Sequence, residues 1–148
     1  MPRISATHSA VIDAPAAKLY AIVADYHKGH PSILPSAFSD LRLEQGGIGA
    51  GTVIRFKTTA MGATREWRGV VSEPQPGRVL VEAYDTGEVT TFTFEPLEEG
   101  RTRVTFTTEW SKGGLKGWVE RLLAPRMMRR MYAKEMQNLA RVAREAMT

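Results

Sequence analysis

The chain has 148 residues, 43% of them hydrophobic, which suits one domain with a sizeable core and is too little for two. It contains no cysteine, which excludes disulfides, thiolate metal sites and cysteine nucleophiles. It has no run of eighteen apolar residues, and its start lacks the basic, apolar and small-residue order of a secretory signal. We therefore expect a single domain over residues 1–148, soluble and cytoplasmic.

The first 45 residues predict two strands separated by two helices. Residues 4–12 carry small and β-branched side chains with one parity that can face a core. Asp13 and Pro15 then mark a helix start. Residues 16–26 place one apolar face on that helix, made of Leu19, Tyr20, Val23 and Tyr26. The glycines and prolines of residues 27–37 allow only a short helical piece before residues 39–44 extend again.

Residues 52–111 have a period of two and predict antiparallel strands joined by tight turns. The turns fall at Met61-Gly62, Pro74–Gly77, Asp85–Gly87 and Glu98–Gly100. Alternating polar residues imply one wet and one buried face. The predicted buried face consists of Ile54, Phe56, Trp67, Val71, Phe92, Phe94, Val104 and Phe106. Together with the two strands predicted before residue 45, these give a sheet of about seven strands.

Residues 115–147 predict a long helix, with Pro125 placed either to kink it or to mark a second start. Its predicted apolar stripe is Met128, Met131, Tyr132, Leu139, Val142 and Ala146. The formal charge of +4 is uneven, because residues 116–148 carry a net +5. Most of that charge is arginine opposite the stripe: Arg126, Arg129, Arg130, Arg141 and Arg144. This is typical of a solvated helix face, so we expect no nucleic-acid partner, and membrane contact is not favoured.

A glycine-rich segment, residues 44–56, contains Gly46, Gly47, Gly49 and Gly51. Phosphate-binding loops lead into a helix N-terminus, whereas this segment leads into a strand. It also lacks the lysine and Ser/Thr of the P-loop pattern. A nucleotide site is therefore excluded here.

The order of elements and four segments resemble a known family. Residues 11–26, 46–56, 94–106 and the closing helix resemble the polyketide cyclase/dehydrase-like branch of the START-like (SRPBCC) superfamily. The resemblance spans nearly the whole chain and implies an α+β helix-grip fold. In that fold, a curved seven-stranded antiparallel sheet grips the long C-terminal helix around an apolar cavity, and two short helices follow the first strand. Such folds host carriers, receptors and enzymes, so the resemblance does not fix the function.

The resemblance also implies that the glycine-rich turn lies near the cavity mouth, where a plain hairpin turn and a moving lid are both open alternatives. Together with the inward pattern, it predicts the cavity lining. The predicted members are Tyr20, Ile54, Phe56, Arg65, Trp67, Phe92, Phe94, Phe106, Met128, Met131, Tyr132 and Glu135. Methionines on such a wall would suit a pliable apolar ligand.

Glu135 breaks the apolar arc of the last helix and should face the cavity. An unpaired buried carboxylate costs several kcal/mol, so Glu135 must pair, be wetted or be protonated. Arg65 shares the inward parity and is the predicted partner, and His8 is a second polar lining candidate. Glu135 is either a ligand-orienting group or general base, or one half of a structural ion pair, which is the favoured interpretation.

Other chemistry has little support. Asp25, His27 and His30 could share a metal only on a continuous helix, which Gly29 and Pro31 interrupt, so no metal and no cofactor are predicted. No Gly-x-Ser-x-Gly elbow for a serine nucleophile occurs.

Two functional classes remain, and whether the protein is an enzyme stays open. We favour a non-catalytic binder or carrier of a hydrophobic small molecule, such as a lipid, isoprenoid, polyketide or aromatic metabolite. The alternative is a polyketide cyclase or dehydratase using Glu135 and His8 as acid/base groups. A third possibility is an interaction module that uses the basic helix face. The sequence predicts neither the ligand nor the oligomeric state.

Overall fold

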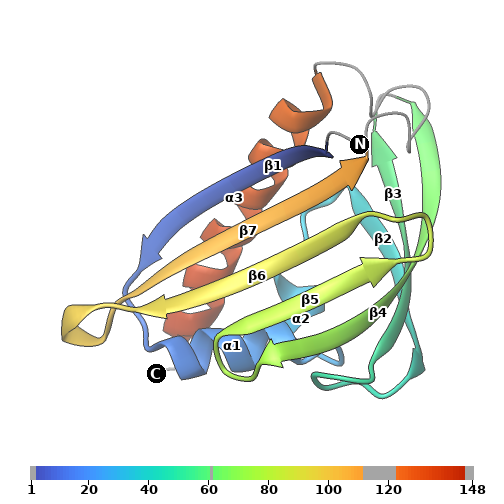
Figure 1. The fold of residues 1–148 in the computed structure, drawn as a ribbon. Coiled ribbons are helices and arrows are strands. Elements are labelled where there is room, and N and C mark those ends of the chain that lie inside the picture. Colours follow the sequence, from blue (N-terminus) through green and yellow to red (C-terminus); the bar gives the residue numbers. More distant parts are fainter. Residues whose placement is uncertain (1–2, 61, 112–122, 146–148) are drawn as a thin grey trace.

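The computed structural model describes residues 3–60, 62–111 and 123–145, which form one curved antiparallel sheet with helices on its concave side (Figure 1). The strands are β1 Arg3–Ile12, β2 Phe38–Gln45, β3 Val53–Ala60, β4 Ala63–Gln75, β5 Val79–Tyr84, β6 Val89–Pro96 and β7 Thr102–Ser111. The helices are α1 Ala16–Ala24, α2 Gly29–Ile33 and α3 Leu123–Glu145, with a 3₁₀ turn η1 at Glu98–Gly100.

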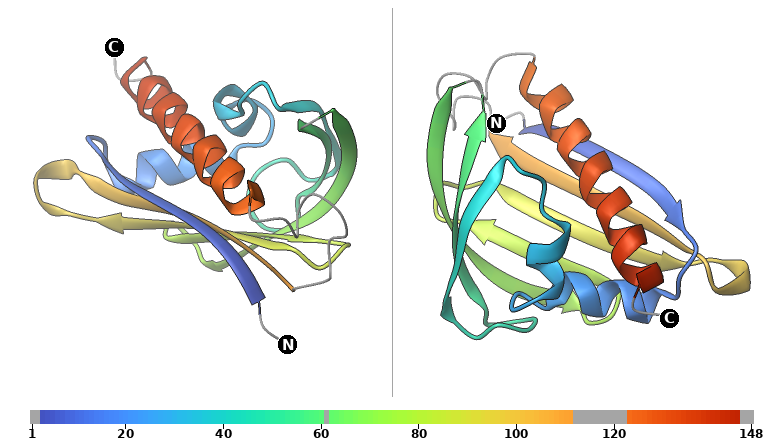
Figure 2. Two further views of the ribbon diagram at one scale, coloured as in Figure 1. Left: turned by 90° about the horizontal axis from the view of Figure 1, so that it is seen from above. Right: turned by 180° about the vertical axis from the view of Figure 1, so that it is seen from behind.

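The sheet order is β1-β7-β6-β5-β4-β3-β2, and every neighbouring pair is antiparallel. Strands β2 to β7 follow one another as a meander, whereas β1 pairs with β7 from the other end of the chain. The β2–β3–β4 end of the sheet curls around toward α3, which crosses the concave face (Figure 2). The predicted helix-grip architecture and seven-stranded sheet are therefore confirmed.

The pairing of β4 and of β2 contains bulges. Strand β4 continues through Pro74 to Gln75, although a turn over Pro74–Gly77 was predicted. The register shifts between Ser72 and Gln75, so Pro74 lies at an irregularity that needs no ladder N–H. In β2 a similar shift lies between Ser39 and Arg42, around Asp40 with φ of 56°.

Helix α3 is described from Leu123, so Pro125 lies in its first described turn. The predicted part at 115–122, Ala146 and the Met61 turn lie outside the described residues. The buried stripe is shifted from the prediction and consists of Tyr132, Glu135, Met136, Asn138, Leu139 and Ala143. Met128, Met131 and Val142 are half-buried, and the five arginines assigned to the outer face are exposed. No helix in the described ranges is long and apolar enough to cross a membrane.

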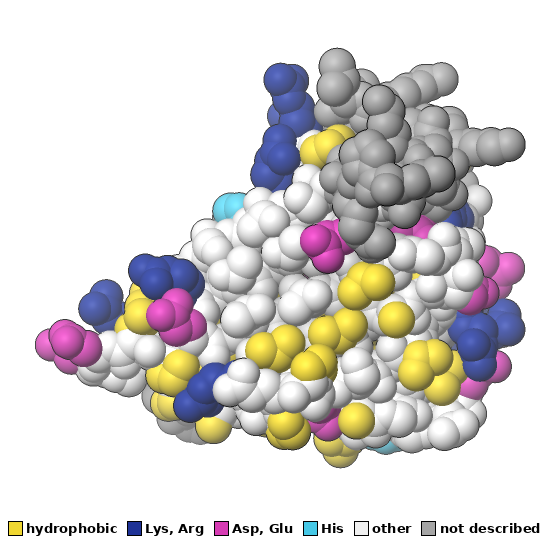
Figure 3. Space-filling model, in the orientation of Figure 1, with side chains coloured by type: hydrophobic (Ala, Val, Ile, Leu, Met, Phe, Trp, Pro, Cys, Tyr) yellow, Lys and Arg dark blue, Asp and Glu magenta, His cyan; other side chains and the backbone are white. Residues whose placement is uncertain are grey.

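The core lies between the sheet and the helices. Seven of the eight residues predicted for the buried face of the sheet are buried, and Trp67 is half-buried. Leu19 and Val23 of α1 and Leu139 of α3 belong to the same buried cluster as Phe94 and Val104. On the convex face, Figure 3 shows mostly uncharged side chains over the middle of the sheet, with charged groups nearer its edges.

The glycine-rich turn is held against the end of α1. Gly46, Gly47, Gly49 and Gly51 all have positive φ. The Tyr26 N–H donates to the Gly47 carbonyl at 2.8 Å, and the Gly49 N–H donates to the Ala24 carbonyl at 2.9 Å. The Ala50 N–H donates to a Glu73 carboxylate oxygen at 2.7 Å. Backbone hydrogen bonds therefore fix this turn to its surroundings.

A candidate ligand cavity with a carboxyl cluster

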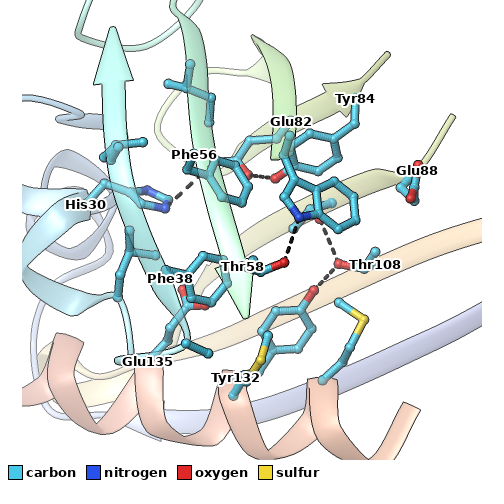
Figure 4. Close-up of a pocket in the computed structure, with 18 of the residues that line it drawn as sticks. His30, Phe38, Phe56, Thr58, Glu82, Tyr84, Glu88, Thr108, Tyr132 and Glu135 are labelled. Atoms are coloured by element: carbon cyan, nitrogen blue, oxygen red, sulfur yellow. Dashed lines mark hydrogen bonds and ion pairs between the residues drawn. The ribbon is translucent and has the colours of Figure 1, made fainter. Parts of the chain in front are cut away.

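A cavity lies between the concave face of the sheet and the first half of α3 (Figure 4). Aromatic side chains form much of its wall: Phe38, Phe56, Trp67, Tyr84, Phe92, Trp110 and Tyr132. Several of these rings contact one another, as in the stacked pair Phe56–Trp67 and the edge-on pair Trp67–Tyr84 with ring centres 5.2 Å apart. Their mutual packing holds the wall in a fixed shape around space that side chains leave free.

Half-buried lining residues mark where the cavity meets the surface. Leu34, Ala37 and Phe38 line one side, on the connection from α2 into β2. Met128 and Met131 line the other side, on the first turns of α3. Leu41, Trp67 and Tyr84 are half-buried as well, so partly exposed residues border the cavity on the sheet, on this connection and on α3.

Glu82 projects from β5 into the cavity and is 3% exposed. The Tyr26 hydroxyl donates to its Oε2 at 2.5 Å, and the Tyr84 hydroxyl donates to its Oε1. Both oxygens accepting hydrogen bonds is the pattern of an ionised carboxylate. Burial, and then the nearby charge of Glu82, raise the pKa of both Tyr26 and Tyr84, so these hydroxyls stay neutral donors.

His30 of α2 lies beside this carboxylate. Its Nδ1 is 2.8 Å from the Val23 carbonyl, which can only accept, so the proton lies on Nδ1. Its Nε2 points toward Glu82 Oε2 at 3.7 Å, and the ring stacks on Tyr26 with centres 4.5 Å apart. The backbone of α1 therefore fixes the orientation of a second ionisable group in the cavity wall.

Glu135 of α3 also lines the cavity and is 3% exposed. Within the described part of the chain its carboxyl group forms no hydrogen bond and no ion pair. Burial raises the pKa of Glu135 well above its usual range, and the negative charge of Glu82 raises it further. Glu135 is thus a buried carboxyl group that lines the cavity and whose pKa is raised.

The predicted pairing of Arg65 with Glu135 is wrong. Arg65 Nη2 lies 2.9 Å from Oε2 of Glu88, which is 1% exposed, although the approach is too oblique for a hydrogen bond. The guanidinium also lies over the Trp67 ring, 3.9 Å from its centre. Arg65 lies on β4 opposite Thr58 of β3, and its partner Glu88 directly precedes β6.

Hydroxyl groups connect the remaining polar positions of the wall. Thr90 and Thr108 share a hydrogen bond of 2.7 Å, and Thr108 also bonds the Tyr132 hydroxyl. The Trp67 indole N–H donates to Thr58 at 2.8 Å. The Trp110 indole N–H is buried at the cavity wall and has no hydrogen-bond partner among the described residues. Apart from the Trp110 N–H, each lining hydroxyl and indole group has a hydrogen-bond partner, since Tyr84 donates to Glu82 and Thr59 bonds Thr64.

Eight of the twelve predicted cavity residues line the cavity: Ile54, Phe56, Trp67, Phe92, Met128, Met131, Tyr132 and Glu135. Tyr20, Arg65, Phe94 and Phe106 do not belong to the lining. Tyr20 donates to Glu73 at 2.6 Å instead, and Phe94 and Phe106 are fully buried in the core. The cavity prediction was therefore too broad toward the packed end of the sheet.

His8 and the glycine-rich turn lie outside the cavity lining. His8 is half-buried on β1 and does not line the cavity, so it cannot act there with Glu135. None of residues 46–51 belongs to the cavity lining, so the glycine-rich turn forms no part of the cavity wall.

Sequence reasoning missed His30, Glu82, Glu88, Thr108 and Trp110 as cavity residues. It considered His30 only as a metal ligand. The alternation along the strands could have indicated them. Glu82 has the same parity as Leu80 and Tyr84, and Glu88 has the same parity as the inward Thr90 and Phe92.

The weak metal candidates serve local structure. Asp25 accepts hydrogen bonds from the backbone N–H groups of His27 and Lys28, at 3.0 and 3.3 Å. His30 is engaged as described above. Among the described residues, no three Asp, Glu or His side chains gather as metal ligands would.

The family model described as polyketide cyclase/dehydrase and lipid transport matches residues 3–144. The chain belongs to this family. Its structure is similar to the solution structure of KanY protein, with a TM-score of 0.84, 28% identity and coverage of 97% of this chain and 99% of that one. No curated protein matches the sequence significantly.

Two plant proteins share the fold at lower identity. Norcoclaurine synthase from Thalictrum flavum has a TM-score of 0.74 and 15% identity, with 97% of this chain and 88% of that one covered. Major latex-like protein 151 from Panax ginseng has a TM-score of 0.72 and 8% identity, with 95% and 97% covered. The family therefore places this chain among ligand-binding helix-grip domains.

Proposed function

We propose that the chain binds one small, largely apolar molecule, such as a lipid, isoprenoid, polyketide or aromatic metabolite, in the cavity between the sheet and α3. The aromatic and methionine wall is the observation that carries this proposal. Covering such surface removes apolar area from water at about 25 cal/mol per Å². The few polar groups in the wall would orient the molecule.

A titration with the neutral dye N-phenyl-1-naphthylamine tests this function. We expect its fluorescence to rise and to saturate at about one dye per chain. Ala37→Phe adds a ring to the cavity wall and should weaken dye binding at least about tenfold, about 1.4 kcal/mol. Ala83→Phe, on the exposed side of β5, is the matched control and should change nothing. Equal binding by all three proteins would show that the dye binds outside the cavity.

A second candidate function is acid/base catalysis, favoured by one observation. His30 has its Nδ1 proton fixed by Val23, which leaves Nε2 facing Glu82 in the cavity wall, and burial raises the pKa of Glu135 in the same cavity. His30 therefore takes the place that His8 had in the sequence-based alternative. Deuterium exchange at the carbons beside a ketone, followed by NMR on 4-phenylbutan-2-one, tests it. A rate that His30→Gln leaves unchanged would remove this candidate.

A further inference from the structure

The ionisable groups that line the cavity are unbalanced in charge. Glu82, Glu88 and Glu135 line it, whereas no lysine or arginine belongs to the lining among the described residues. Arg65, just outside, is 2.9 Å from Glu88 and offsets that charge. Among the described residues, Glu82 and Glu135 therefore have no lysine or arginine beside them.

These two carboxyl groups differ in what they can still accept. Both oxygens of Glu82 already accept tyrosine hydroxyls. Glu135, in contrast, is only 3% exposed, and neither of its oxygens forms a hydrogen bond or an ion pair with the described residues. A polar side chain buried this far and left unpartnered is costly unless something else bonds it. Because Glu135 lines the cavity, a ligand held there is in position to be that partner.

We propose that the ligand is an aromatic or aliphatic amine that binds as its ammonium ion, with the ammonium against Glu135 and close to Glu82. This inference rests on the proposed function and specifies its ligand. An ammonium group has hydrogen-bond donors and no acceptor, so it complements the oxygens of Glu135 and the lone pairs of the wall hydroxyls. It would also supply the positive charge that Glu82 and Glu135 lack.

The aromatic wall suits the same chemistry. Rings attract cations through their faces, and Arg65 already lies 3.9 Å from the centre of the Trp67 ring. Tyr84, Phe92 and Tyr132 offer further rings in the same wall as the two carboxyl groups. An ammonium on an apolar body can therefore contact carboxylate, ring and apolar surface at once.

Binding of such an ion is coupled to the ionisation of Glu135. The ammonium favours the charged form of the carboxyl group beside it, whereas burial favours the protonated form, so binding shifts the Glu135 proton toward solvent. The other ionisable groups facing Glu135 are His30 from α2, Glu82 and Tyr84 from β5, Tyr26 after α1, and Tyr132 on α3. The three tyrosines remain neutral because burial raises their pKa. Proton release therefore comes from Glu135 unless His30 supplies it.

Calorimetry with 3-phenylpropylamine and its neutral analogue 3-phenylpropan-1-ol tests the inference. We expect the amine to bind the native protein at least about tenfold more tightly than the alcohol at pH 7. Titrations in phosphate and in Tris, which differ in ionisation heat, should show release of about one proton with the amine and none with the alcohol. Glu135→Gln should lose about tenfold for the amine, keep its affinity for the alcohol and abolish proton release. Glu95→Gln, an equal charge change at an exposed residue paired with Arg103, should alter nothing.

Four results would overturn the inference. Equal affinity for amine and alcohol would reject the amine and leave cavity binding intact, whereas binding of neither compound would reject both proposals. Proton release that persists in Glu135→Gln would assign it to His30. Tighter binding of 4-phenylbutan-2-one than of the amine would mean that Glu135 acts as a neutral donor to an oxygen acceptor.

Discussion

The two halves of the layer between α3 and the sheet use the same architecture for different purposes. In the half that includes Leu139 and Ala143, side chains from α1, α3 and the sheet fill the space completely. In the half that includes Met131 and Glu135, the same helix and sheet leave a cavity with buried carboxyl and hydroxyl groups. Residues of α3 that fill the core and residues of α3 that line the cavity are therefore separated by about two helical turns.

The largest effect that would sharpen this comparison is on folding stability. Leu139→Ala removes a fully buried side chain from the filled half and should lower the free energy of unfolding by about 3 kcal/mol. Met131→Ala, at the half-buried cavity wall, should cost less than about 1 kcal/mol because the space beside it is already open. Urea unfolding of both variants measures the difference. Equal losses would break the separation between the two halves.

The next effect concerns pH and Glu135. The unfolded chain releases this proton near pH 4.5, whereas burial and Glu82 raise the folded pKa well above that value. Between the two values the folded state binds more protons, so the native protein loses stability as pH rises, by about 1.4 kcal/mol per pH unit. Glu135→Gln does not titrate and should lack this loss. Unfolding measured from pH 4 to pH 8 should therefore show the variant gaining stability relative to the native protein.

This expectation reverses the one that follows from a structural ion pair. With Arg65 as partner, Glu135→Gln would strand a cation and destabilise the protein at neutral pH. Arg65 is instead paired with Glu88, so no stranded cation results. A variant that is less stable than the native protein at pH 7 would show that Glu135 has a cationic partner after all.

The smallest effect tests the glycine-rich turn. A Cβ atom at Gly49 would lie 2.3 Å from a Glu73 carboxylate oxygen, in a residue with φ of 63°, so Gly49→Ala should cost about 1 to 2 kcal/mol. Gly51→Ala shares the positive φ but has open space around it, and should cost less. Both should leave the rates of dye binding and release unchanged, because this turn does not line the cavity. Slower dye binding and release in stopped-flow measurements would support the alternative that this turn is a moving lid.

Periodicity predicted the architecture because each element buries a face that its own spacing defines. The alternation that places Phe92, Phe94 and Phe106 inward is local, and burial follows directly from it. The same holds for Glu135, whose position on the helix is enough to place it inside. Both kinds of prediction need only one element at a time.

Partners were harder to predict, because they depend on how strands and helices meet. The pairing of Arg65 with Glu88 joins β4 to the start of β6, and that of Tyr26 with Glu82 joins the end of α1 to β5. The alternation along β5 also places Glu82 inward, but the predicted inward set contained mainly apolar residues. Only the three-dimensional arrangement shows that both oxygens of Glu82 accept hydrogen bonds and that those of Glu135 do not.

Strand β1 has a consequence for the way the domain assembles. Its last residue, Ile12, pairs with Thr102, 90 positions later, whereas the β6–β7 hairpin closes between Pro96 and Thr102 over 6. Loop-closure entropy grows with the logarithm of length, so the first pairing costs roughly 2 kcal/mol more to begin. Entropy thus favours the meander first and the N-terminal strand last, and during synthesis this edge of the sheet must wait until β7 has been made.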